Sequence, residues 1–267
     1  MSKPVAPGLR RATIARALAE LGVEPGDLLL THSSLSSMGP VVGGAPTVIA
    51  AILEALAPDG TAVFPTLTGA PWAGGNGALV FDPARSECWT GRIPEAARAR
   101  PDALRSRHPT HSVCAIGPLA DRVTRDHEHC ETPCGWGSPY DILQQMGGRV
   151  LFIGVDLACN TMLHHVEETA GVSYVCTPEP VPAHIVEQNG WRTTVRLRLH
   201  VQGPRRDYPK LEPELLERGI LRLGQIGAAT ARLVDARPMV ELLRPRVAAD
   251  PGCILWDPSA VNAATDA

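Results

Sequence analysis

The sequence lacks long apolar runs and an excess of charge of one sign. No apolar run approaches the eighteen or so residues of a membrane span, and the N-terminal residues lack the apolar core of a signal peptide. The 25 basic and 28 acidic residues nearly balance, without the basic domain or stripe that nucleic-acid binding normally requires. We therefore expect a cytoplasmic protein with no membrane and no nucleic-acid partner.

Aromatic residues are also scarce. The 267 residues include Trp 5, Tyr 3 and Phe 3, against Gly 25 and Pro 25. Such a ratio indicates much loop and turn. The hydrophobic content of 44% is still enough for a sizeable core.

Cysteine is present in an odd number and scattered. Without a secretory signal, the 7 cysteines are better interpreted as reduced thiols than as a disulfide framework. Cys130 and Cys134 lie in His-Glu-His-Cys-Glu-Thr-Pro-Cys, which offers zinc donor types but has no second cluster of matching spacing.

Apolar runs and helical periodicities alternate along most of the chain, which predicts an α/β fold. Alternation of apolar and polar residues near 194–201 indicates a half-exposed antiparallel strand. We expect one or two helices between 215 and 233 and frayed residues from 258. With no repeat or linker, residues 1–267 are predicted to form one domain with a core at about 9–233. Expected helices cover residues 9–21, 48–56, 93–100 and 160–170, and expected strands cover 27–31, 61–65, 112–116 and 149–155.

A hydroxyl-rich segment, Thr-His-Ser-Ser-Leu-Ser-Ser at 31–37, follows the first predicted strand. Ligands bind at such strand ends in open α/β sheets, and hydroxyls before a helix suit a phosphate or pyrophosphate. No Walker or Gly-x-Gly-x-x-Gly pattern follows, so nucleoside triphosphate and Rossmann interpretations lose support. A plain serine-rich turn is equally consistent.

A second segment, His-Pro-Thr-His-Ser at 108–112, precedes another predicted strand. Its two histidines could ligate a metal, bind a ligand or cap a loop. Taken alone, the structural roles are favoured.

The segment 160–168 carries two histidine–glutamate pairs at helical spacing. His164 and Glu167 share a face at i,i+3, so the carboxylate can orient the imidazole as a general base. His165 and Glu168 repeat the spacing. The zincin pattern is absent, and an exposed helix with two ordinary ion pairs is the alternative.

Acidic residues occur after a glycine-rich stretch and again near 126–131. Carboxylates of this kind could attract a cationic substrate, but they are more often solvated surface. They are Asp82, Glu87, Glu95, Asp126, Glu128 and Glu131.

Four segments in order resemble the aminoglycoside 3-N-acetyltransferase family, which does not have the Gcn5-related fold. They are His-Ser-Ser-Leu-Ser at 32–36, Arg-Ser-Arg-His-Pro-Thr-His-Ser at 105–112, Thr-Pro-Cys-Gly-Trp-Gly-Ser-Pro at 132–139, and 154–167. The resemblance covers about residues 9–233. It implies a single-domain mixed central sheet with flanking helices, acetyl-coenzyme A as the donor and an amine as the acceptor.

The resemblance also implies roles for residues at matching positions. His164 becomes the general base and Glu167 its orienting carboxylate, with no metal. The coenzyme A channel is implied to include His32, Ser33, Ser34, Leu35, Ser36, Pro109, Thr110, His111 and Ser112. Family members commonly carry a Gly-His-Asp segment where this chain has Asp156-Leu157-Ala158-Cys159, so a polar His and Asp near the acceptor are missing.

Amide formation requires a base, because an ammonium is no nucleophile. We expect direct transfer without an acyl-enzyme, with oxyanion donors from backbone N–H groups near residues 33–36 or His111. Charge complementarity predicts that Asp82, Asp156 and Glu168 bind further ammonium groups of an aminoglycoside.

Two alternatives remain. The same fold could acetylate an amine that is not an aminoglycoside, which the missing His-Asp pair favours. A zinc hydrolase or zinc-binding protein would instead use His164, His165, Cys130 and Cys134.

Overall fold

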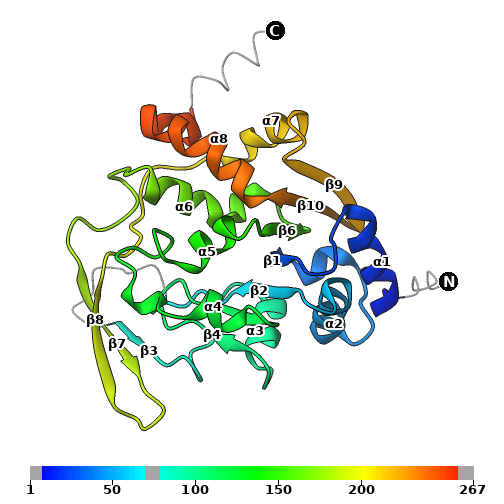
Figure 1. The fold of residues 1–267 in the computed structure, drawn as a ribbon, viewed down its shortest axis with the longest axis horizontal. Coiled ribbons are helices and arrows are strands. Elements are labelled where there is room, and N and C mark those ends of the chain that lie inside the picture. The colour runs from blue at the N-terminus through cyan, green and yellow to red at the C-terminus, as the bar shows by residue number, and fades with distance from the viewer. Residues whose placement is uncertain (1–7, 70–78, 258–267) are drawn as a thin grey trace, which may run out of the picture.

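The computed structural model describes residues 8–69 and 79–257. A seven-stranded sheet runs through the centre in the order β4-β5-β2-β1-β6-β10-β9, and a three-stranded sheet β3-β7-β8 lies at one side (Figure 1). Strand β1 (Leu28–Ser33) pairs in parallel with β2 (Thr61–Pro65) and with β6 (Arg149–Ile153). All other pairs of the large sheet are antiparallel. The predicted mixed sheet with flanking helices is confirmed.

The antiparallel strands extend the sheet on both sides. They are β4 (Leu104–Arg105), β5 (Val113–Ile116), β9 (Leu221–Ile226) and β10 (Ala229–Asp235). The smaller sheet contains β3 (Leu79–Phe81), β7 (Val181–Val186) and β8 (Arg192–Leu197). Strand β8 pairs antiparallel with β7, which confirms the antiparallel strand, but it ends at Leu197 and so covers only the first part of the predicted 194–201.

Successive residues of the central strands face opposite sides of the sheet. Leu28 and Leu30 belong to one hydrophobic cluster, whereas Leu29 belongs to the other. The Leu29 cluster includes α1 (Arg11–Leu21), α2 (Gly44–Leu56) and α3 (Arg92–Arg98). The opposite cluster includes α4 (Ala120–Thr124), α5 (Pro139–Gln145), α6 (Thr161–Thr169), α7 (Glu212–Glu217) and α8 (Ala236–Ala249). A sheet with apolar contacts on both faces explains the unbroken apolar runs of its central strands.

The prediction of helices between 215 and 233 is wrong. Only α7 is helical there, and β9 and β10 form a hairpin whose turn contains Gly227 at φ 64°. The alternating burial of β10 follows from its pairing with β6, where Leu233 lies opposite Leu151. Long-range pairing therefore determines the structure of this segment more than local propensity does.

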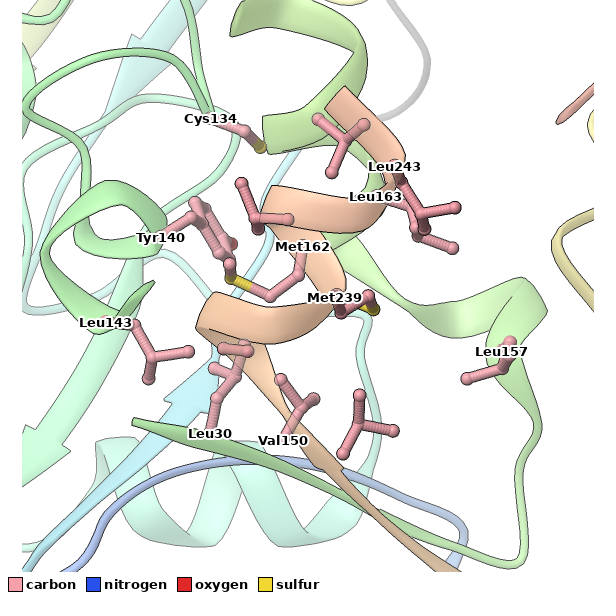
Figure 2. Packing of buried hydrophobic residues seen from close by; sticks show 14 of the residues in the cluster. Leu30, Cys134, Tyr140, Leu143, Val150, Leu157, Met162, Leu163, Met239 and Leu243 are labelled. Atoms are coloured by element: carbon pink, nitrogen blue, oxygen red, sulfur yellow. The ribbon is translucent and has the colours of Figure 1, made fainter. Parts of the chain in front are cut away.

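Helix α8 extends the hydrophobic core beyond residue 233. Its Met239 and Leu243 pack beside Met162 and Leu163 of α6 (Figure 2). The predicted fraying from 258 lies outside the described residues. Among residues 8–69 and 79–257, no helix has the length and hydropathy needed to cross a membrane.

Candidate active site

A pocket of about 430 Å³ opens at the ends of the central strands. Strand β1 contributes Thr31, His32 and Ser33, and α6 contributes Thr161 and His164. Helix α6 begins here because the Asn160 side chain accepts a hydrogen bond from the Met162 backbone N–H. The remaining lining residues are Pro65, Leu67, Trp89, Thr90, Pro94, His111, Val155, Ala158, Cys159 and His200.

His164 and Glu167 make the contact that their spacing predicts. Nδ1 of His164 lies 2.8 Å from Oε2 of Glu167, whose side chain is fully buried. The Nε atom of Arg206 donates to the other carboxylate oxygen at 3.0 Å, and the Tyr208 hydroxyl lies 3.1 Å from His164 Nδ1. The imidazole is therefore anchored through one nitrogen, which leaves Nε2 for chemistry in the pocket.

The surroundings of Glu167 keep its carboxylate ionised. Burial acts to raise its pKa, but the hydrogen bond and charge of His164 and the charge of Arg206 outweigh burial, and the pKa is lowered. An ionised carboxylate favours the tautomer with hydrogen on Nδ1, which is the tautomer a general base requires.

Further histidine rings surround His164. The His200 ring lies 4.7 Å from the His164 ring and 4.3 Å from the His111 ring, measured between centroids. Burial first, and then neighbouring histidines, lower the pKa values of His111 and His200 well below the usual range. His32 stacks on Phe152, and burial followed by the charge of His164 lowers its pKa to about 3. The imidazoles of His32, His111 and His200 in the pocket lining are therefore neutral at pH 7.

The serine-rich loop lines a neighbouring cavity of about 510 Å³. Ser33 belongs to the lining of both cavities, so the two meet at the end of β1. The structure brings together here four of the residues predicted for the coenzyme A channel, along with one arginine. The lining comprises Ser33, Ser34, Leu35, Ser36, Gly39, Val41, Gly44, Gly91 and Arg92.

Most residues of the segment 109–112 do not line the pocket but make hydrogen bonds next to it. Of its residues, His111 lines the pocket. Ser112 is fully buried and donates to the Thr66 carbonyl at 2.7 Å, and the Pro109 carbonyl accepts from Thr68. The Thr110 hydroxyl lies 2.9 Å from His111 Nδ1, which orients that ring.

The three carboxylates predicted to bind ammonium groups do not line the described pocket. Asp82 accepts from the backbone N–H groups of Ala84 and Arg85 in a turn. Asp156 accepts from the Ala158 backbone N–H and lines a separate cavity of about 340 Å³.

The position of Glu168 differs from those of Asp82 and Asp156. Its side chain is 1% exposed, and it bonds to His200 rather than forming the predicted pair with His165. Burial raises its pKa to about 7, against hydrogen bonds from Thr132 and the Cys134 backbone.

Comparison with known proteins decides the family. The sequence pattern of the family described as aminoglycoside 3-N-acetyltransferase matches residues 30–247. The chain belongs to this family. Aminoglycoside N(3)-acetyltransferase VIII of Streptomyces fradiae is 35% identical to it over 86% of this chain and 88% of that protein.

Solved structures of acetyltransferases have the same architecture. A variant of aminoglycoside acetyltransferase AAC(3)-IVa in complex with a gentamicin has a TM-score of 0.81 at 29% identity, covering 97% of this chain and 95% of that one. AAC-IIIb in a binary complex with coenzyme A has a TM-score of 0.77 at 28% identity, covering 90% and 97%. The resemblance read from four short segments is thus confirmed, and the family is one of acyltransferases.

In this acetyltransferase, the ligand set predicted for zinc is not assembled. Among the described residues, no three of His164, His165, Cys130 and Cys134 have ligand atoms within 4.8 Å of one another. His165 is fully buried, and its Nδ1 lies 2.7 Å from the Cys134 carbonyl oxygen. All seven cysteines are free thiols.

Two other groups of side chains have ligand atoms within 4.8 Å of one another. One is His111, Cys134 and His200, and the other is Glu168, Cys176 and His200. Burial raises the pKa values of both thiols, which favours the protonated form rather than the metal-binding thiolate. Nε2 of the shared His200 is already bonded directly to Glu168.

The buried histidines predict acid lability for this acetyltransferase. His127 accepts from Ser106 at Nδ1 and donates from Nε2 to the Pro133 carbonyl, and burial lowers its pKa from 6.5 to about 4. Between these values only the unfolded chain binds the proton, so the stability contribution is complete above pH 6.5 and is lost as the pH falls toward 4. We expect the free energy of unfolding to fall by up to about 1.4 kcal/mol per pH unit for this residue.

Urea unfolding at fixed pH values between 7 and 4 measures the slope of the free energy of unfolding against pH. In His127→Gln, the slope should be shallower than in the wild type. A variant with an unchanged slope would contradict the assignment.

Proposed function

We propose that this protein transfers the acetyl group of acetyl-coenzyme A directly to the 3-amino group of an aminoglycoside, with His164 as the general base. The observation that carries the proposal is the anchoring of His164 by a buried, ionised Glu167 at the edge of a pocket. Related structures have been solved in complex with coenzyme A and with a gentamicin, which supports the donor and acceptor classes. A cytoplasmic location, where acetyl-coenzyme A is available, is part of the proposal.

The reaction follows from this arrangement. Nε2 of His164 removes a proton from the acceptor ammonium, and the freed amine attacks the thioester carbonyl. The tetrahedral intermediate collapses with cleavage of the carbon–sulfur bond, and coenzyme A leaves as a thiolate that takes up the second proton lost by the amine nitrogen, giving the neutral amide and the free thiol. Glu167 stabilises the imidazolium that forms, while Arg206 holds the carboxylate. No covalent acyl-enzyme is needed.

The oxyanion requires hydrogen-bond donors, and two of those predicted from the sequence are already used. Ser34 N–H donates to the Ile153 carbonyl, and His111 N–H donates to His108 Nδ1. The Ser33 hydroxyl is buried without a partner among the described residues, and Ser33 as a residue lines both cavities. We assign it the role of oxyanion donor, because a pre-positioned hydroxyl at the junction can point toward a thioester carbonyl.

A second candidate function is acetylation of an amine that is not an aminoglycoside. The described lining consists of imidazoles, hydroxyls and apolar residues such as Leu67, Trp89 and Pro94. This surface suits an acceptor with one reactive amine beside an apolar group as well as it suits a polycation.

An acceptor panel separates the two functions. Purified protein and acetyl-coenzyme A are mixed with gentamicin, apramycin, sisomicin or simple apolar primary amines, and thiol release is followed. We expect release with at least one aminoglycoside. Release with apolar amines alone would favour the second candidate, and no release with any amine would reject both.

A further inference from the structure

The turn at residues 132–135 has no part in the reaction above, yet it encloses a buried carboxylate beside the active site. Oε2 of Glu168 accepts from the Cys134 backbone N–H at 2.8 Å. A β-carbon at Gly135 would lie 3.3 Å from this oxygen and 2.2 Å from the Thr132 hydroxyl oxygen. The turn therefore packs directly around the carboxylate, and glycine at 135 permits the close approach.

The other carboxylate oxygen of Glu168 contacts His200, a histidine of the active-site pocket. Oε1 of Glu168 lies 2.5 Å from Nε2 of His200. The ring of His200 meets the His164 ring at an interplanar angle of 63° and the His111 ring at 68°. His200 also lines the pocket. A continuous set of contacts thus joins the buried turn to the proposed general base.

We propose that Glu168 and His200 form a second carboxylate–imidazole pair that positions His164. The inference rests on the proposed function, because it concerns the group that acts as base there. Glu167 and the Tyr208 hydroxyl both hold Nδ1 of His164, but contacts at one nitrogen leave the ring able to tilt about that nitrogen. The ring of His200, packed against that of His164, limits this tilt, and Glu168 keeps His200 from turning.

The two carboxylates have different roles: Glu167 supplies a charge next to the base, and Glu168 fixes its position. Glu167 is fully buried beside Arg206 and bonds the base itself. Glu168 does not line the pocket, and among the contacts above it reaches His164 only through His200. It is therefore a positioning residue, and its shape and hydrogen bonds should matter more than its charge.

Three variants test this pair. In Glu168→Ala, kcat should fall between about 10-fold and 100-fold, because small displacements of a catalytic group have effects of this size. KM for acetyl-coenzyme A should stay within about twofold, since the serine-rich loop is untouched. Glu168→Gln keeps an acceptor for Cys134 and a partner for His200, so it should recover most of the lost kcat. His200→Ala should resemble Glu168→Ala without opening the turn.

Glu187→Gln is the matched control, because this glutamate pairs with Arg107 away from the pocket and should leave kcat unchanged. Thermal unfolding of each variant measures how much folded enzyme is present. The proposal is overturned if Glu168→Ala retains kcat per folded enzyme, or if Glu168→Gln loses as much as Glu168→Ala.

A measurement that does not need turnover separates this inference from the proposed function. In ¹⁵N-labelled protein, the ring resonances of His164 should shift in Glu168→Ala and return in Glu168→Gln. If the wild type acetylates no acceptor, the proposed function fails while this test still applies. Unshifted His164 resonances in Glu168→Ala would overturn the pair.

Discussion

Replacing His164 with alanine is expected to lower kcat by about 10²-fold to 10⁴-fold, the usual contribution of a positioned general base. Nε2 of this ring is the group proposed to accept the ammonium proton, while Nδ1 is committed to Glu167. The serine-rich cavity does not include His164 in its lining, so the affinity for coenzyme A should change little. Thiol-release kinetics and titration calorimetry with coenzyme A measure the two effects separately.

His184→Ala is the matched control for this prediction. His184 lies on β7, where its Nδ1 is 3.0 Å from the Thr194 hydroxyl, and it does not line the pocket. We expect wild-type kcat in this variant. Wild-type turnover in His164→Ala would show that His164 is not the general base, and loss of coenzyme A binding would indicate a structural role for this residue.

Replacing Glu167 with glutamine is expected to lower kcat by about 10³-fold or more, by analogy with carboxamide substitution in histidine–aspartate pairs, where the wrong tautomer results. A neutral amide can donate to Nδ1 of His164, which would place the ring hydrogen on Nε2 and leave no lone pair for the ammonium proton. The volume of the side chain is nearly unchanged, so packing around α6 should survive. Kinetics and circular dichroism on the same preparation test both statements.

Glu214→Gln provides a control with a similar ion pair. Glu214 binds Arg246 through both oxygens at 2.7 Å, as Glu167 binds Arg206 through one. Removing the charge of Glu214 should affect stability slightly and kcat not at all. Equal kinetic losses in the two variants would mean that the loss in Glu167→Gln reflects folding rather than the tautomer of His164.

The contact between His164 and Glu167 could be predicted because helical spacing is a local property. Residues three apart on α6 share a face wherever the helix lies, and the distance of 2.8 Å confirms the pairing. The same logic failed for Glu168. Its side chain turns away from His165 and bonds to His200, which is 32 positions away in the sequence.

The partners that complete the site come from parts of the chain with no motif of their own. Arg206, Tyr208 and His200 lie beyond β8 and reach α6 only through the tertiary fold. Their residue types offered a weak signal, since a buried carboxylate needs cationic or hydrogen-bonding partners. No spacing rule identifies which ones.

The central sheet was predictable where its strands are short apolar runs, and less so at its edge. Strand β2 has the predicted bounds of 61–65, because a strand with both faces covered has an unbroken apolar sequence. The hairpin of β9 and β10 was taken for helix, because glycines and leucines at mixed spacing carry no clear period. Gly227, at a positive φ between the two runs, was the available turn signal.

Transfer of a labelled acetyl group directly tests acetylation of an aminoglycoside without an acyl-enzyme. Wild-type protein is mixed with acetyl-coenzyme A carrying ¹³C at the carbonyl and with gentamicin, and the products are followed by NMR and by intact-protein mass. We expect an amide carbonyl signal on the antibiotic, one free thiol for each amide formed and no acetyl adduct on the protein. Thiol release without an acceptor together with a labelled protein, or no amide on the antibiotic, would contradict direct transfer by His164.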